Sequence, residues 1–161
     1  AQVSDAELNH VPVADGNSIA MIVRHVTGNL RARFTDFLTS DGEKPWRDRE
    51  GEFAPGTYTR DEITTAWREA FELLERELGG IPDSEMGREV TIRGVGLTVH
   101  EALSRSLSHV AMHVGQIVLL SKIAAGKEWK TLSIPRGGSA AYNANPHAEK
   151  AAAHAAALNR R

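Results

Sequence analysis

The chain has 161 residues, of which 41% are hydrophobic and 25% charged, and its formal net charge is −2. This balance is typical of a soluble globular protein and disfavours a nucleic-acid partner, because no basic surplus exists. The absence of cysteine excludes disulfides, thiolate metal sites and a cysteine nucleophile. No apolar run approaches the roughly 18 residues that cross a bilayer and no secretory signal opens the chain, so we expect one cytoplasmic domain over residues 1–161.

The first long helix is expected to begin after Asn17 or Ser18 and to run to about Leu38. Its apolar positions follow the helical period. They are Ile19, Ile22, Val23, Val26, Leu30, Phe34 and Phe37. His25 belongs neither to this apolar face nor to the solvated one, and it shares a flank with Asp36. We expect that flank to look into a helical bundle.

Residues 40–58 hold three glycines, two prolines and three aromatic residues, which favours an ordered loop over a linker. The second long helix is expected to begin after Thr59, which can form a capping box with Glu62. Gly79 and Gly80 end it. Its apolar stripe consists of Ile63, Ala66, Trp67, Ala70, Phe71, Leu74 and Leu78.

A short extended piece is expected at 89–93, within a segment that contains glycine and proline. Thr98 and Glu101 then form a second capping box and open a helix that runs to about Ala125. Its core stripe is Val99, Leu103, Leu107, Val110, Val114 and Ile117. A loop over 127–145 follows, and an alanine-rich helix over 145–161 is expected to form a mobile tail.

Two histidines, His109 and His113, stand four residues apart on one flank of the third long helix. This spacing points both side chains the same way, which suits the binding of one metal ion. His25, on another helical flank, could supply a third ligand. Nitrogen ligands suit Zn, Ni, Fe(II) or Mn. The alternative is that the histidines are hydrogen-bonded residues of the core, because single histidines on helix flanks usually are.

Four further polar residues are candidates for the site. Arg33 projects toward the apolar side of its helix, and we favour an ion pair with Asp36 or a loop carboxylate over binding of a substrate carboxylate. Asn29, one turn beyond His25, is either a hydrogen-bond partner of that imidazole or a polar packing residue. Asp36 is the nearest candidate general base by helical phase. Arg136 could bind an anion, although an ordinary exposed loop arginine is the simpler interpretation.

Five segments of the chain resemble the DinB-like (YfiT-like) superfamily of metalloenzymes, as a bacterial branch of it. They are Asn17–Ala20, His25–Asn29, Arg33–Arg47, His109–Ile117 and Trp129–Gly138. The resemblance implies an all-α four-helix bundle that carries one divalent ion, with Zn or Ni favoured over Fe or Mn, on His25, His109 and His113. It also implies a homodimer. Only about sixteen residues precede the first histidine-bearing helix, so a truncated first helix is expected.

Some members of this superfamily are S-transferases that use low-molecular-weight thiols, and others are DNA-damage-inducible proteins without an assigned reaction. The leading hypothesis is therefore a metal-dependent enzyme acting on a small molecule, as a thiol S-transferase or a hydrolase, with Asp36 and Arg33 as catalytic candidates. A chain without cysteine would take its thiol from a cosubstrate. The alternatives are a non-catalytic metal-binding stress protein and a helical interaction module whose histidines belong to the core. No nucleic acid or membrane partner is expected.

Overall fold

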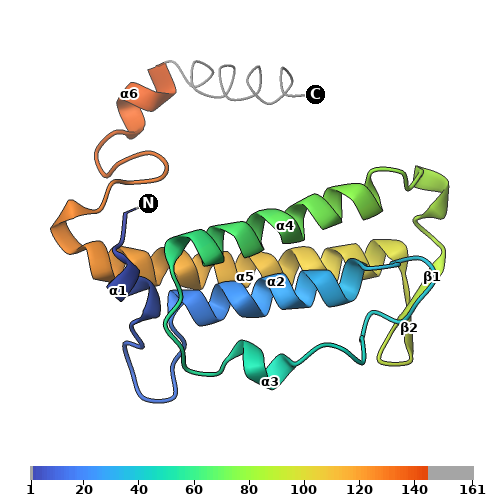
Figure 1. Ribbon diagram of the computed structural model, residues 1–161. Coiled ribbons are helices and arrows are strands. Elements are labelled where there is room, and N and C mark those ends of the chain that lie inside the picture. The colour runs from blue at the N-terminus through green and yellow to red at the C-terminus, as the bar shows by residue number, and fades with distance from the viewer. Residues whose placement is uncertain (1, 145–161) are drawn as a thin grey trace. The chain divides into compact units, whose positions relative to one another are not determined.

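The computed structural model describes residues 2–144 (Figure 1). The chain divides into two compact units, residues 1–127 and 128–161, and each is described by itself. The expected helix over 145–161 lies outside the described residues.

The first unit is built on three long helices, α2 (Ile19–Phe34), α4 (Arg60–Leu78) and α5 (Val99–Ala125) (Figure 1). Helix α2 packs against both of the others. The shorter elements are α1 (Asp5–Asn9), α3 (Arg49–Glu52), the 3₁₀ turns η1 (Asp83–Glu85) and η2 (Gly126–Glu128), and the strands β1 (Glu89–Ile92) and β2 (Val95–Thr98). In the second unit the described residues contain α6 (Ser139–Ala144).

The expectation of an all-α four-helix bundle needs correction. Residues 2–144 are mostly helical, but they contain three long helices and a small antiparallel sheet. The extended piece expected near Glu89 is β1, and it pairs with β2 through the register Glu89↔Thr98 and Ile92↔Val95. Arg93 and Gly94 make the turn with φ values of 56° and 72°. Two successive positive φ values are typical of tight hairpins, which a search for helical periodicity overlooks.

Local capping sets the helix starts as expected. The Ser18 side chain accepts the backbone N–H of Met21 at 3.2 Å. Thr59 and Thr98 begin α4 and α5, each in a capping box with the glutamate three residues later. Helix α2, however, ends at Phe34, four residues before the expected Leu38. Thr35 is extended and Asp36 has a φ of 51°, so the helical phase of α2 stops there.

The core lies around α2. All seven expected apolar positions of this helix and its following turn are buried, with Val26 and Leu30 at most 1% exposed. The hairpin contributes Val90 and Ile92, and α5 contributes Val99. The sequence prediction for α5 is wrong at Leu107, which is 72% exposed, and at Val114, which is 38% exposed. At Leu107 the reason is an apolar groove of about 310 Å³, lined by residues of α2, α4 and α5, which leaves that part of α5 uncovered.

One segment, Val99–Glu128, is long and apolar enough by length and composition to cross a membrane. A single helix of this kind is weak evidence for a membrane protein, because the core helix of a soluble protein meets the same criteria. The cytoplasmic location therefore stays a prediction.

Candidate metal centre

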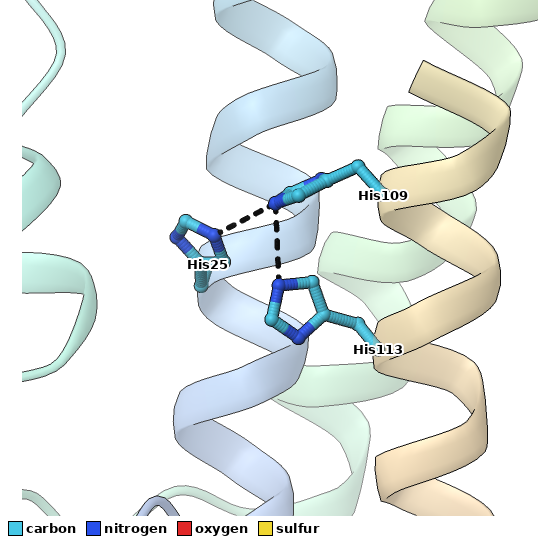
Figure 2. Close-up of side chains that lie close together, drawn as sticks. All are labelled: His25, His109 and His113. Carbon is cyan, nitrogen blue, oxygen red and sulfur yellow. Dashed lines mark hydrogen bonds between the residues drawn. The ribbon is translucent and has the colours of Figure 1, made fainter. Parts of the chain in front are cut away.

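The three histidines predicted to share a site do lie together (Figure 2). His25 comes from the middle of α2, and His109 and His113 come from successive turns of α5. The Nε2 atom of His109 is 3.2 Å from His25 Nε2 and 3.2 Å from His113 Nε2. One ring nitrogen of each residue lies within 4.8 Å of the others. His25 thus presents a nitrogen atom to the same point as His109, which lies 84 positions further along the chain, and His113.

Two of the three spacings between these nitrogen atoms fit a metal ion, and the third lies within 4.8 Å. Ligand nitrogens about 2.0–2.1 Å from zinc, at tetrahedral angles, lie roughly 3.3 Å apart. The two observed Nε2–Nε2 distances of 3.2 Å match that edge length. Because one nitrogen of each ring lies within 4.8 Å of the others, the three imidazoles could hold a divalent ion.

His25 is oriented by a carboxylate. Its Nδ1 donates to Glu52 Oε2 at 2.9 Å, and Glu52 is only 7% exposed. Arg47 holds the same carboxylate with two hydrogen bonds, from Nε to Oε1 at 2.8 Å and from a terminal nitrogen to Oε2 at 2.9 Å. Burial alone would raise the pKa of Glu52, but the hydrogen bonds from His25 and Arg47 lower it below its usual range. Glu52 is therefore ionised and accepts the His25 Nδ1 proton.

The approach of Glu52 to α2 depends on a glycine. A Cβ atom at position 28 would lie 2.2 Å from Glu52 Oε1, so only Gly28 leaves room for the carboxylate there. Glu52 itself belongs to α3, a short helix whose N-cap is Asp48, with its carboxylate accepting the Gly51 N–H at 2.9 Å. The long loop between α2 and α4 is thus folded so that one of its acids reaches the histidine site.

The two histidines of α5 have different surroundings. His113 Nδ1 donates to Gln116 Oε1 at 2.7 Å, one turn further along the helix. His109 Nδ1 is buried and has no hydrogen-bond partner among the described residues. The outer nitrogens of His25 and His113 are therefore fixed as donors, whereas that of His109 is left open.

A count of protons shows that hydrogen bonds alone cannot give each Nε2 atom of the three histidines a partner. When a ring carries its one proton on Nδ1, bonded to Glu52 in His25 or to Gln116 in His113, its Nε2 directs a lone pair at His109. His109 Nε2 carries at most one proton and can donate it to only one of them. One lone pair is left without a donor, and a divalent cation at the shared point would satisfy it.

The protonation states also suit metal binding. Burial, together with the nearby His113 and His25, lowers the pKa of His109 to about 4. Burial likewise lowers the pKa of His113, although the hydrogen bond with Gln116 acts in the opposite direction. Both rings are therefore neutral at pH 7, which is the form that binds metals.

A cavity of about 180 Å³ lies beside the histidines. Its lining includes two of the three histidines and a group of arginines from α2, α3, α5 and the connecting segments. The lining residues are His25, Asn29, Arg33, Arg47, Arg49, Ile92, Arg93, Arg105, Ser106 and His109. A small molecule in this cavity would thus contact both the histidines and positive charge.

Of the other expected site residues, Arg33 and Asn29 line the cavity and Asp36 does not. Arg33 lines the cavity, and it donates to the carbonyl of Gly42 and to Glu43 Oε2, the latter at 3.2 Å, so its partner is a loop carboxylate. Asn29 also lines the cavity, but the partner of His25 is Glu52. The expected catalytic role of Asp36 gains no support, because α2 ends before this residue and leaves it exposed and outside the cavity lining.

The sequence predictions missed Glu52, Arg47 and Arg105. Glu52 and Arg47 lie in an irregular loop without a helical period, and nothing in their spacing relates them to His25. Two features of the sequence could have indicated them. Gly28 inside α2 marks a close approach to that helix, and Arg105 precedes His109 by four residues in α5. Arg136 is exposed and belongs to the second unit.

A family model described as "Protein of unknown function (DUF1572)" matches residues 1–138. No curated protein matches the chain.

Proposed function

Since the chain belongs to the family described as "Protein of unknown function (DUF1572)", whose description names no activity, we propose a function from the site itself. The protein binds one divalent metal ion through His25, His109 and His113 and uses it in an enzymatic reaction of a small molecule. Zn and Ni are the favoured ions, with Fe and Mn as alternatives, as the resemblance to DinB-like metalloenzymes implies.

One observation carries this proposal. Three imidazoles direct their Nε2 atoms at one point, and the proton count leaves a lone pair there without a donor. In a purely structural core such an arrangement would carry an energetic cost without compensation. A cation removes that cost. The resemblance to DinB-like metalloenzymes, which implies the same three ligands, supports the proposal further.

The surroundings favour catalysis over a closed structural site. Three protein ligands leave a position for water or substrate, and the neighbouring cavity gives that position room. A bound divalent ion would lower the pKa of a water molecule or a thiol in this place. Glu52 holds the Nδ1 proton of His25 and so keeps Nε2 available as a ligand. Arg33 and Asn29 can orient a substrate from the cavity wall.

The reaction that we propose is transfer of a low-molecular-weight thiol, with hydrolysis as the alternative. The absence of cysteine requires that the sulfur nucleophile comes from a cosubstrate. Asp36 has no part in this proposal, because it lies outside the cavity lining. The proposed reaction therefore depends on the metal ligands and the cavity residues alone.

Metal content per chain tests the proposal first. We expect about one ion per chain in wild-type protein purified without chelator or histidine tag, measured by elemental mass spectrometry. His109→Ala should lose the ion, because it removes the histidine that lies between the other two. His100→Ala is the matched control, since His100 is an exposed histidine of the same helix.

A different result would identify the histidines as core residues. In that case wild-type protein stays empty after Zn, Ni and Mn are offered. His109→Ala would then lower the free energy of unfolding by about 1–3 kcal/mol through loss of a buried polar group. Metal bound equally by wild type and His109→Ala would also contradict the proposal.

A further inference from the structure

The cavity beside the histidines has an unusual charge pattern. Five arginines line it, at positions 33, 47, 49, 93 and 105, and no aspartate or glutamate is among its lining residues. We propose that this cavity binds an oxyanion group, a carboxylate or a phosphate, of a small-molecule ligand. The inference deepens the proposed function and rests on it, since the ligand would be the substrate of the metal site.

The arginines outnumber the carboxylates that pair with them. Arg33 and Arg93 share one carboxylate, that of Glu43, at 3.2 and 2.8 Å. Arg47 pairs with Glu52, whose carboxylate also accepts from His25. A guanidinium group has five N–H donors, so a pair of guanidinium groups that share one carboxylate keeps several donors for a ligand.

Arg105 is the least committed of the five. It is exposed at the cavity and forms no ion pair or side-chain hydrogen bond within residues 2–144. Arg49, in contrast, contacts Glu50 at 2.8 Å and lies over the ring of Phe53. A guanidinium without a partner at the entrance of a cationic cavity is suited to capture an anion from solution.

Helical spacing sets the cationic groups beside the metal ligands. On α5, Arg105 precedes His109 by four residues and so lies on the same face. On α2, Asn29 and Arg33 follow His25 at intervals of four, and all three line the cavity. The Asn29 amide forms no hydrogen bond within the described part of the chain, so it is available to a ligand. An anion held by the arginines would place the rest of its molecule near the histidines.

The volume of the cavity and the geometry of its guanidinium groups limit which ligands it can bind. At about 180 Å³ the cavity is smaller than the roughly 300–1,000 Å³ typical of sites for drug-sized ligands. A short-chain carboxylate or a small phosphate ester fits these limits better than a nucleotide or a peptide. Arginine forks match the two oxygens of either group in a bidentate manner. The proposed ligand therefore carries a small oxyanion group, and the test distinguishes a carboxylate from a phosphate.

Anion titration of the variant Arg105→Gln tests the proposal. Succinate and inorganic phosphate are titrated by calorimetry into chelator-treated and zinc-loaded protein at one low ionic strength, with succinamide as the uncharged probe. We expect saturable binding of at least one anion, at least fivefold weaker in Arg105→Gln, and none of succinamide. Arg31→Gln is the matched control, because Arg31 is exposed on α2 and does not line the cavity. The anion that binds more tightly shows whether the ligand group is a carboxylate or a phosphate.

Two results would overturn the proposal. One is the absence of saturable anion binding in both the chelator-treated and the zinc-loaded protein, and the other is equal weakening by Arg31→Gln and Arg105→Gln. Zinc stoichiometry is measured on the same samples, and Arg105→Gln should leave it unchanged. Protein that binds zinc but no anion refutes this inference alone, whereas protein that binds anions but no zinc refutes the metal proposal. Arg105→Lys, which keeps the charge but loses the fork, should recover part of the affinity.

Discussion

Glu52 accepts hydrogen bonds from His25 and from Arg47, and so it couples a histidine of α2 to the loop that follows this helix. A carboxylate behind a metal-ligating histidine fixes the tautomer and raises the basicity of the ligating nitrogen. Arg47 is nearly fully buried, with 2% of its side chain exposed, and Glu52 is its only ion-pair partner among the described residues. The carboxylate therefore serves both the site and the fold of the loop.

We expect Glu52→Gln to weaken metal binding by about 10- to 100-fold, because the amide accepts the His25 proton less strongly than a carboxylate does. Competition with a chromogenic chelator measures this affinity. Glu50→Gln is the control, since the Glu50 side chain is 86% exposed and pairs with the surface residue Arg49. Equal affinity in wild type and Glu52→Gln would show that the His25–Glu52 hydrogen bond does not tune the ligand.

The residues of the candidate site differ in how far the sequence could predict them. His25, His109 and His113 lie on long helices, where a regular period relates sequence position to facial placement. Glu52 reaches the site from an irregular loop, so no period relates it to His25. Asp36 was placed at the site from the helical period, but the helix ends at Phe34, so the period does not apply to this residue.

Among the elements, α2 contains a glycine that its helical structure alone does not explain. Gly28 lies inside a helix, where glycine is unfavourable by about 1 kcal/mol relative to alanine. The reason is the carboxylate of Glu52, which occupies the space of a Cβ atom. Gly115 of α5 has no such neighbour, since nothing lies within 4 Å of the position of its missing Cβ. These two glycines make a matched pair of sites for testing the packing of α3 on α2.

Gly28→Ala should lower the free energy of unfolding by roughly 1–2 kcal/mol, because the cost of displacing Glu52 exceeds the gain in helix propensity. Gly115→Ala, at an exposed helical position, should raise it by about 0.5–1 kcal/mol. Urea unfolding followed by circular dichroism measures both. Stabilisation by both substitutions would mean that Glu52 does not pack closely against α2.

The long helices were predictable because α2, α4 and α5 span 16, 19 and 27 residues, which is enough for a clear apolar period and capping residues. The hairpin was half predicted, as β1 without β2, since the Val95–Thr98 strand contains Gly96 and ends at Thr98, which is also the N-cap of α5. The exposure of Leu107 was not predictable, because it depends on how far apart α4 and α5 lie across α2. The predicted homodimer stays untested.

At the scale of the whole molecule, the low pKa of His109 links stability to pH. Burial and the neighbouring histidines lower this pKa to about 4 in the folded protein, against an ordinary value of 6.5. Between these values the unfolded chain binds a proton at this position and the folded chain does not. The stability that is present above pH 6.5 is therefore lost progressively as the pH falls toward 4.

We expect the chelator-treated protein to lose stability between pH 7.5 and pH 5.5, measured by urea unfolding at several pH values. His109→Gln should flatten this dependence, because neither state then gains a proton at position 109. His100→Gln should keep the wild-type slope, since His100 is exposed. A slope that is the same in wild type and His109→Gln would show that another group controls the acid sensitivity.

The separation of 84 residues between His25 and His109 has a consequence for chain connectivity. The chain has no cysteine and so cannot form the covalent cross-links that restrain many small domains. An ion shared by His25, His109 and His113 would close a loop that contains α3, α4 and the hairpin. Separation of α2 from α5 would then require release of the ion, so metal supply would control how often the domain opens and how long it survives proteolysis.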